Sequence, residues 1–158
     1  MNKFMHSLKK KMPNCQLYGL EPTKLFADLA ARRLDCLVLT GSFDGIIFDG
    51  EYDLITCNHV LEHVNDPILF FQNLRSNLNK SGCLYIEVPS PVDFDDKLLP
   101  PDHDRFLMQH LWYYSPEILN KIAMDMGFQT IKVETQKTVI GKYNLVAIFQ
   151  INKAHLSV

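Results

Sequence analysis

The feature that most constrains the fold of this chain is the alternation of short apolar runs with amphipathic segments. Runs typical of strands lie at residues 15–20, 36–40, 52–57 and 83–88. Helical patterns lie at 2–11, 23–33, 67–78 and 116–126. Short buried strands separated by helices require crossover connections, which produce a parallel sheet with helices on its faces.

The last two strand patterns, at residues 128–135 and 144–151, have no helix between them and flank a turn with Gly141. They therefore predict a hairpin and at least one antiparallel strand. Together the patterns predict an α/β fold, a Rossmann-like and mostly parallel sheet with an antiparallel C-terminal strand. Ligands of such sheets bind at the carboxyl ends of the strands. We expect one domain spanning residues 1–158.

The helical patterns also predict which side chains face the core. The expected inward residues are Leu25, Phe26, Leu29 and Ala30 in one helix, and Ile68, Phe71, Leu74 and Leu78 in another. Thr23 is placed to cap the first of these helices, and Lys80-Ser81-Gly82 is expected to end the second.

The composition narrows the classes of function. A net charge of -2 gives no basis for sequence-blind binding to nucleic acid. The four cysteines contain no CxxC pair, so a thiolate zinc site is not expected. Neither a signal peptide nor a long apolar segment is apparent, which favours the cytoplasm and argues against a membrane partner.

The stretch NHVLEHVNDP, which follows the third strand pattern, carries the densest chemistry in the sequence. On a helix, His59, Glu62 and His63 would share one face, a spacing that can hold a divalent ion. The same residues can instead shape the rim of a pocket. We expect the second role and no metal, which leaves His59, Glu62 and His63 as weak candidate ligands.

Five segments in order resemble class I S-adenosylmethionine-dependent methyltransferases, in particular the small-molecule O- and C-methyltransferases. The segments are YGLEP, GSFDG, EYDLITCNHVLEHVNDP, LNKSGCLYIEVPSP and QHLWYYSPEILNKIAMDMGF. The resemblance covers the chain from about Cys15 onward. It implies S-adenosylmethionine as cofactor and methyl transfer to a small-molecule acceptor, whose identity the sequence does not specify.

The resemblance also implies the cofactor-binding residues. Glu21 matches the acid that binds the ribose hydroxyls, for which an ionised carboxylate is suited because it only accepts hydrogen bonds. Gly19 lies in the same YGLEP segment. Ser42 and Phe43 match the turn along the adenine, although Phe43 can equally fill the core below that turn. Asn58 and His59 match the loop that passes under the methionine part and faces the substrate.

Two histidines are candidates for proton chemistry, His110 and His59, and His110 is the better candidate of the two. His110 resembles the histidine of a Glu-His pair in sugar C-methyltransferases, but Gln109 stands in place of the Glu. As a base, His110 would deprotonate the acceptor; alternatively, it packs on Trp112 or Tyr113. One branch of the resembled family methylates the 3′ ends of plant small RNAs and binds a metal through Glu-Val-x-Glu-His and a further histidine. His110 could be that further ligand here.

The Gly-rich GxGxG loop of the resembled family does not occur among the seven glycines. The sequence therefore reads as if it began inside the first helix, with the first strand missing. We interpret the chain as an N-terminally truncated methyltransferase whose activity is impaired unless a homodimer or partner chain completes the sheet. The alternatives are a non-catalytic pseudo-methyltransferase that regulates another protein and, more remotely, a metal-dependent hydrolase.

Overall fold

The computed structural model describes residues 3–42, 50–93, 95, 97–100 and 109–152. The chain divides into two compact units, Met1–Phe48 and Asp49–Val158, and each is described by itself. None of the described helices is long and apolar enough to cross a membrane. Phe43 and residues 101–108 of the loop that precedes Gln109 lie outside the described residues.

The first unit is a β-α-β arrangement preceded by a helix. Its elements are α1 (Lys3–Lys11), β1 (Tyr18–Glu21), α2 (Lys24–Leu34) and β2 (Leu37–Thr40). Strands β1 and β2 pair in parallel, and their carboxyl ends meet where Glu21 is opposite Thr40. This confirms the parallel crossover predicted from the sequence.

The inward face predicted for α2 is wrong. Leu25 and Phe26 are 64% and 57% exposed, and the buried residues of the helix are Ala27 and Leu34. A periodic apolar stripe identifies one face of a helix, but it does not say whether another element covers that face. Thr23 does occupy the N-cap position of α2, but its side chain makes no capping hydrogen bond.

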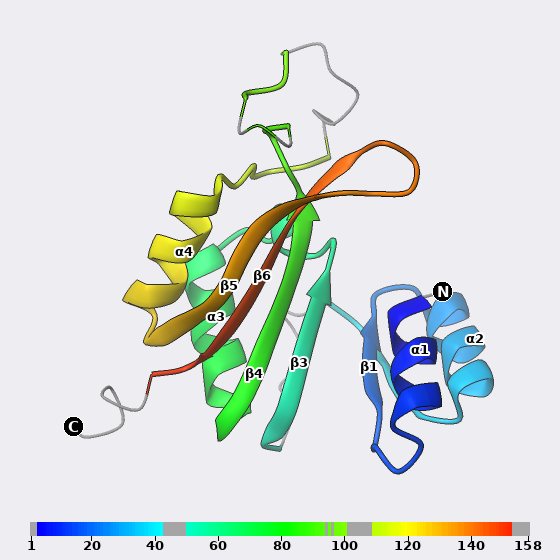
Figure 1. The fold of residues 1–158 in the computed structure, drawn as a ribbon. Helices are drawn as coiled ribbons and strands as arrows, with labels where there is room; N and C mark the ends of the chain where they lie inside the picture. Colours follow the sequence, from blue (N-terminus) through cyan, green and yellow to red (C-terminus); the bar gives the residue numbers. More distant parts are fainter. Residues whose placement is uncertain (1–2, 43–49, 94, 96, 101–108, 153–158) are drawn as a thin grey trace. The chain divides into compact units, whose positions relative to one another are not determined.

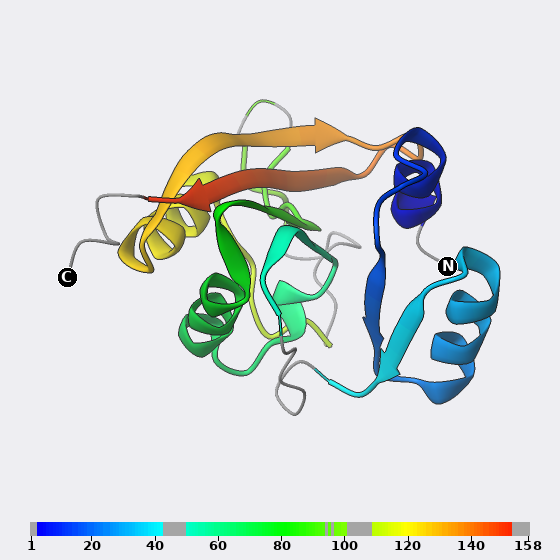
Figure 2. The ribbon, with the colours of Figure 1, turned by 90° about the horizontal axis from the view of Figure 1, so that it is seen from below.

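The second unit holds a mixed sheet with helices against one face (Figures 1 and 2). Its elements are β3 (Tyr52–Asn58), the 3-10 helix η1 (Leu61–His63), α3 (Pro67–Ser76), β4 (Leu78–Pro89), α4 (Pro116–Asp125), β5 (Phe128–Lys137) and β6 (Tyr143–Ile151). The strand order is β3-β4-β6-β5, with β3 and β4 parallel and the pairs β4-β6 and β5-β6 antiparallel. The predicted α/β class with an antiparallel C-terminal strand is therefore confirmed.

The core of this unit is a cluster of aromatic rings between α3 and the C-terminal strands. Phe71 of α3 is fully buried and lies 6.0 Å from Phe128 and 6.4 Å from Phe149 between ring centroids, edge to face. Such packing adds to the free energy of burying the rings. Phe70 is also buried, whereas Ile68, predicted to face inward, is 42% exposed.

The predicted end of the second helix is also wrong. α3 ends at Ser76, and Lys80, Ser81 and Gly82 belong to β4. Leu78 pairs with Tyr52 and Cys83 pairs with Leu54, so the intervening residues of β4 form an irregularity in the ladder. The Gly-containing stretch therefore marks a bulge in a strand, which is another common position for glycine.

Candidate functional site

Polar side chains gather in the second unit where β3 and β4 end. Asn58 is the last residue of β3 and is opposite Glu87 in the parallel ladder. Asn144, near the start of the antiparallel β6, is opposite Pro89 of β4. The carboxyl ends of parallel strands are where ligands of α/β sheets bind, so this edge is the candidate site.

Glu87 is the centre of the hydrogen bonds at this edge. Its Oε2 accepts from Asn58 Nδ2 at 3.0 Å and from the Tyr85 hydroxyl at 3.1 Å, and its Oε1 accepts from Asn144 Nδ2. Burial, followed by the nearby Glu87 charge, raises the pKa of Tyr85 to about 12, so this hydroxyl keeps its proton and donates. Sequence reasoning missed Glu87 and Asn144; the available signal was an acid within the apolar strand pattern LYIEV.

His59 has a left-handed backbone, with φ of 53°, and it is not part of a helix. Its N–H donates to the Glu87 carbonyl at 2.8 Å, so the β3–β4 pairing continues to this residue before the chain turns. The prediction that residues 59, 62 and 63 share one face of a helix is therefore wrong, because only Leu61–His63 is helical. The imidazole instead lies between two carboxylates, with Nδ1 3.3 Å from Glu62 Oε1 and Nε2 3.8 Å from Glu87 Oε1.

Glu62 is a carboxylate with almost no exposure, at 1%. Its Oε1 faces His59, while its Oε2 has no hydrogen-bond partner among the described residues. Leaving a buried polar group without a partner costs about 1–3 kcal/mol, and more for a charged group. Its backbone carbonyl accepts from the N–H groups of Leu111 and Trp112, which holds the segment before α4 against η1.

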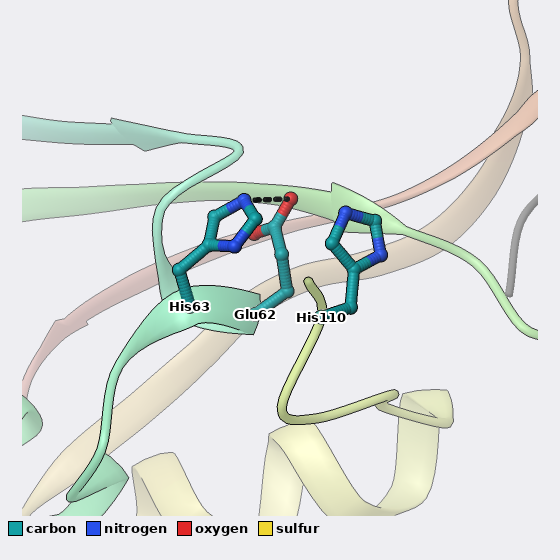
Figure 3. Close-up of side chains that lie close together, drawn as sticks. All are labelled: Glu62, His63 and His110. Carbon is teal, nitrogen blue, oxygen red and sulfur yellow. Dashed lines mark ion pairs between the residues drawn. The ribbon is translucent and has the colours of Figure 1, made fainter. Parts of the chain in front are cut away.

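That segment brings His110 beside Glu62 and His63, as Figure 3 shows. One ligand atom of each of the three residues lies within 4.8 Å of the others. The rings of His63 and His110 are 4.9 Å apart between centroids, and the His110 ring also lies 5.5 Å from that of Tyr113. The structure thus joins His110 to the HVLEH segment and at the same time confirms the ring contact with Tyr113.

The predicted cofactor residues of the first unit lie at the carboxyl end of β1 and just beyond β2. Glu21 ends β1, and one carboxylate oxygen accepts from the Thr23 N–H at 3.0 Å. A carboxylate offers further lone pairs, so Glu21 retains the capacity to bind a ribose diol. Ser42 is exposed just after β2, whereas Gly19 packs on Val38, whose Cγ2 lies 3.2 Å from the position of an added Cβ.

Asn58 is a predicted cofactor-binding residue of the second unit. Its Oδ1 is buried and has no hydrogen-bond partner among the described residues. An amide oxygen in this state is suited to accept from an ammonium or N–H group of a ligand. Asn58 therefore keeps a buried acceptor for a ligand donor at the carboxyl end of β3.

A parallel βαβ unit and a polar cluster at strand carboxyl ends are features of nucleotide- and cofactor-binding α/β proteins. The family model described as a methyltransferase domain matches residues 8–133. The chain belongs to this methyltransferase family, as its sequence motifs predicted. The family supports S-adenosylmethionine as the cofactor, again as predicted.

Solved structures with the same fold are numerous. The N-methyltransferase NodS from Bradyrhizobium japonicum aligns with a TM-score of 0.70 over 94% of this chain and 81% of its own, at 14% identity. A chain in the complex of the Haloferax volcanii Trm112 methyltransferase activator with its candidate methyltransferase aligns with a TM-score of 0.75 over 94% of this chain and 77% of its own, at 13% identity. No curated protein sequence matches the chain significantly. At such identities the likeness establishes the fold.

Proposed function

We propose that this protein transfers a methyl group from S-adenosylmethionine to a small-molecule acceptor in the cytoplasm. The observation that carries the proposal is the position of His59, held between Glu62 and Glu87 at the carboxyl ends of β3 and β4. The family assignment supplies the reaction class, and this cluster supplies a group that can take a proton.

The bound cofactor would supply a methyl group already activated on a sulfonium, so that its carbon–sulfur bond breaks as the bond to the acceptor forms. The acceptor's proton must then go to a base, and His59 is suited to take it. Protonation would occur at Nε2, and the buried Glu62 carboxylate beside Nδ1 would stabilise the resulting imidazolium. Of the two predicted histidines, we assign this role to His59, because two carboxylates flank its ring.

In the first unit, we propose that Glu21 binds the ribose hydroxyls and that Ser42 lies along the base. The support for Glu21 is its place at the end of β1, where the parallel strand directs its carboxylate to the ligand-binding edge. Gly19 has a packing role against Val38 that accounts for a small residue at that position.

Calorimetric titration with S-adenosylhomocysteine tests the cofactor proposal directly. We expect saturable binding of one molecule per chain, and binding about tenfold weaker for Glu21→Gln, since the neutral amide loses a charge-assisted pair. Lys24→Gln, which changes an exposed neighbour on α2, is the matched control and should bind as the unchanged chain does. Absence of binding at about 1 mM ligand would refute the proposal.

One observation favours a second candidate, a role in association with another chain. β3 is the outer strand of its sheet among the described residues, so the side of its backbone that does not pair with β4 offers hydrogen-bonding groups to a further strand. Light scattering across a range of concentrations tests this, because a homodimer through β3 dissociates on dilution. A Leu54→Pro variant removes a backbone donor from this strand, and it should shift the protein to monomers. The difference in affinity for S-adenosylhomocysteine between Glu21→Gln and its control Lys24→Gln should stay the same in this background.

A further inference from the structure

The cluster of Glu62, His63 and His110 brings two further imidazoles to the carboxylate that the proposed methyl transfer uses only as a partner of His59. Each residue offers one ligand atom, and these atoms lie within 4.8 Å of one another. We propose that the three side chains bind a divalent transition-metal ion such as Zn²⁺. Two imidazoles and a carboxylate are a donor set that zinc accepts, and three protein ligands leave a position open for water or another ligand.

The hydrogen bonds of His63 prepare it as a ligand. Its Nδ1 lies 3.0 Å from the carbonyl oxygen of Gln109, an atom that can only accept, so Nδ1 carries the hydrogen. In the neutral ring this leaves the lone pair on Nε2, which lies 3.9 Å from Glu62 Oε1 (Figure 3). A histidine whose second nitrogen donates to a backbone carbonyl is the usual arrangement of a metal ligand, because that bond fixes the tautomer.

The burial of Glu62 gives an independent reason for a cation here. This carboxylate is 1% exposed, and its Oε2 has no partner among the described residues. A buried negative charge is normally compensated by an opposite charge or a metal. An ion held between Glu62 and the two imidazoles would compensate this charge. The Glu62 oxygen that lies 3.3 Å from His59 Nδ1, Oε1, also lies 3.9 Å from His63 Nε2. His59 then acts on the site from outside, as a positioning residue for the carboxylate.

The position of the third ligand could not be obtained from the spacing of the motif. His110 is far from Glu62 in sequence and reaches it because the backbone N–H groups of Leu111 and Trp112 donate to the Glu62 carbonyl. The Trp112 indole N–H also donates to the Val64 carbonyl at 2.7 Å, which fixes the same segment a second time. His63 is 44% exposed in its side chain, so an ion has a path of entry from solvent.

Titration of the chelator-treated protein with Co²⁺, followed by its visible absorption and then by displacement with Zn²⁺, tests this site without any need for activity. We expect one ion per chain, and a loss of affinity of about a hundredfold or more in both His63→Ala and His110→Ala, since even the loss of an outer partner costs about 10–100-fold. The matched control is His6→Ala, which removes an exposed histidine from α1. It should bind Co²⁺ as the unchanged chain does.

Two results would overturn the proposal: no stoichiometric binding to the unchanged chain, or binding that survives in the double variant of His63 and His110. A rise in the melting temperature of the unchanged chain with Zn²⁺ is expected as well, since an ion that binds only the folded state stabilises it. This second measurement needs no variant to fold. Because neither readout involves S-adenosylmethionine, failure here leaves the methyl-transfer proposal standing, and failure of cofactor binding leaves this one standing.

Discussion

The two carboxylates at the site predict opposite effects of the same substitution on stability. The test uses two single variants, Glu62→Met and Glu87→Met, because methionine has a similar length to glutamate and no charge. Glu62 has one oxygen without a partner among the described residues, whereas Glu87 accepts from Asn58, Tyr85 and Asn144. Glu62→Met removes an unsatisfied buried group, and Glu87→Met creates several.

The structure sets the size of each effect. Removing the unsatisfied oxygen of Glu62 recovers about 1–3 kcal/mol, from which about 0.5–1.5 kcal/mol is lost with the hydrogen bond to His59. The net expectation is a stabilisation of about 1 kcal/mol in the metal-free protein, which raises the melting temperature by about 2–4 °C in a chain of this size. Glu87 is 23% exposed in its side chain, so water can bind to some of the donors that lose their acceptor in Glu87→Met. We expect Glu87→Met to destabilise by about 2–4 kcal/mol.

The assay is thermal and urea unfolding after treatment with chelator, followed by the fluorescence of Trp112. This is the only tryptophan of the chain, and it lies in the unit that holds both acids. Its signal therefore reports the unfolding of that unit. If Glu62→Met lowers the melting temperature as much as Glu87→Met does, Glu62 has a partner that this reasoning does not include. With Zn²⁺ added, the unchanged chain should melt at a higher temperature than Glu62→Met, because the unchanged chain binds the ion and the variant does not.

The remaining predictions concern the core and the backbone. Phe71→Ala should cost about 3–5 kcal/mol in urea unfolding, because it empties the centre of the aromatic cluster, whereas the exposed Ile68→Ala should change stability by about 0.5 kcal/mol or less. Burial raises the pKa of the Cys57 thiol to about 12, so this thiol should react with an alkylating reagent at pH 8 only after unfolding. Because the folded state favours the protonated thiol, its contribution to stability should be lost as the pH rises from 9 towards 12. Gly127→Ala should lower the melting temperature more than Gly141→Ala, as measured by calorimetry. Both glycines have φ near 80°, but only at Gly127 does an added Cβ lie 3.0 Å from the Arg75 guanidinium.

The sequence predicted the elements of the fold well, because periodicity and turn residues are local signals. The helix from Pro116 carries its own start signal, a Ser115 side chain that accepts from the Ile118 N–H at 3.3 Å. The face of α2 was wrong because exposure depends on what packs against a helix, and the apolar spacing of Leu25 and Phe26 does not contain that information.

For the candidate site, the sequence indicated Asn58, His59, Glu62, His63 and His110 but not how these residues are arranged. Glu87 and Asn144 come together because β6 runs antiparallel beside β4, a pairing between distant segments that no local pattern specifies. Glu87 also lies in a strand of otherwise apolar character, where an acid is costly unless several donors satisfy it. Such an acid in a strand was the one local signal that could have indicated the residue.

The geometry of HVLEH depends on one backbone torsion. A helix through His59 would place its ring beside His63 on a common face, and the motif would hold a metal by itself or not at all. With φ of 53°, His59 instead ends the β3–β4 ladder and presents its ring to Glu87 as well as to Glu62. A residue with a Cβ pays about 1–3 kcal/mol for such a conformation, and strain of this kind persists at functional sites because the surroundings fix it. The turn thereby separates two roles that the motif alone would merge: the ring of His59 lies between Glu62 and Glu87 and is available for proton transfer, while the ion that we propose is held by Glu62, His63 and His110.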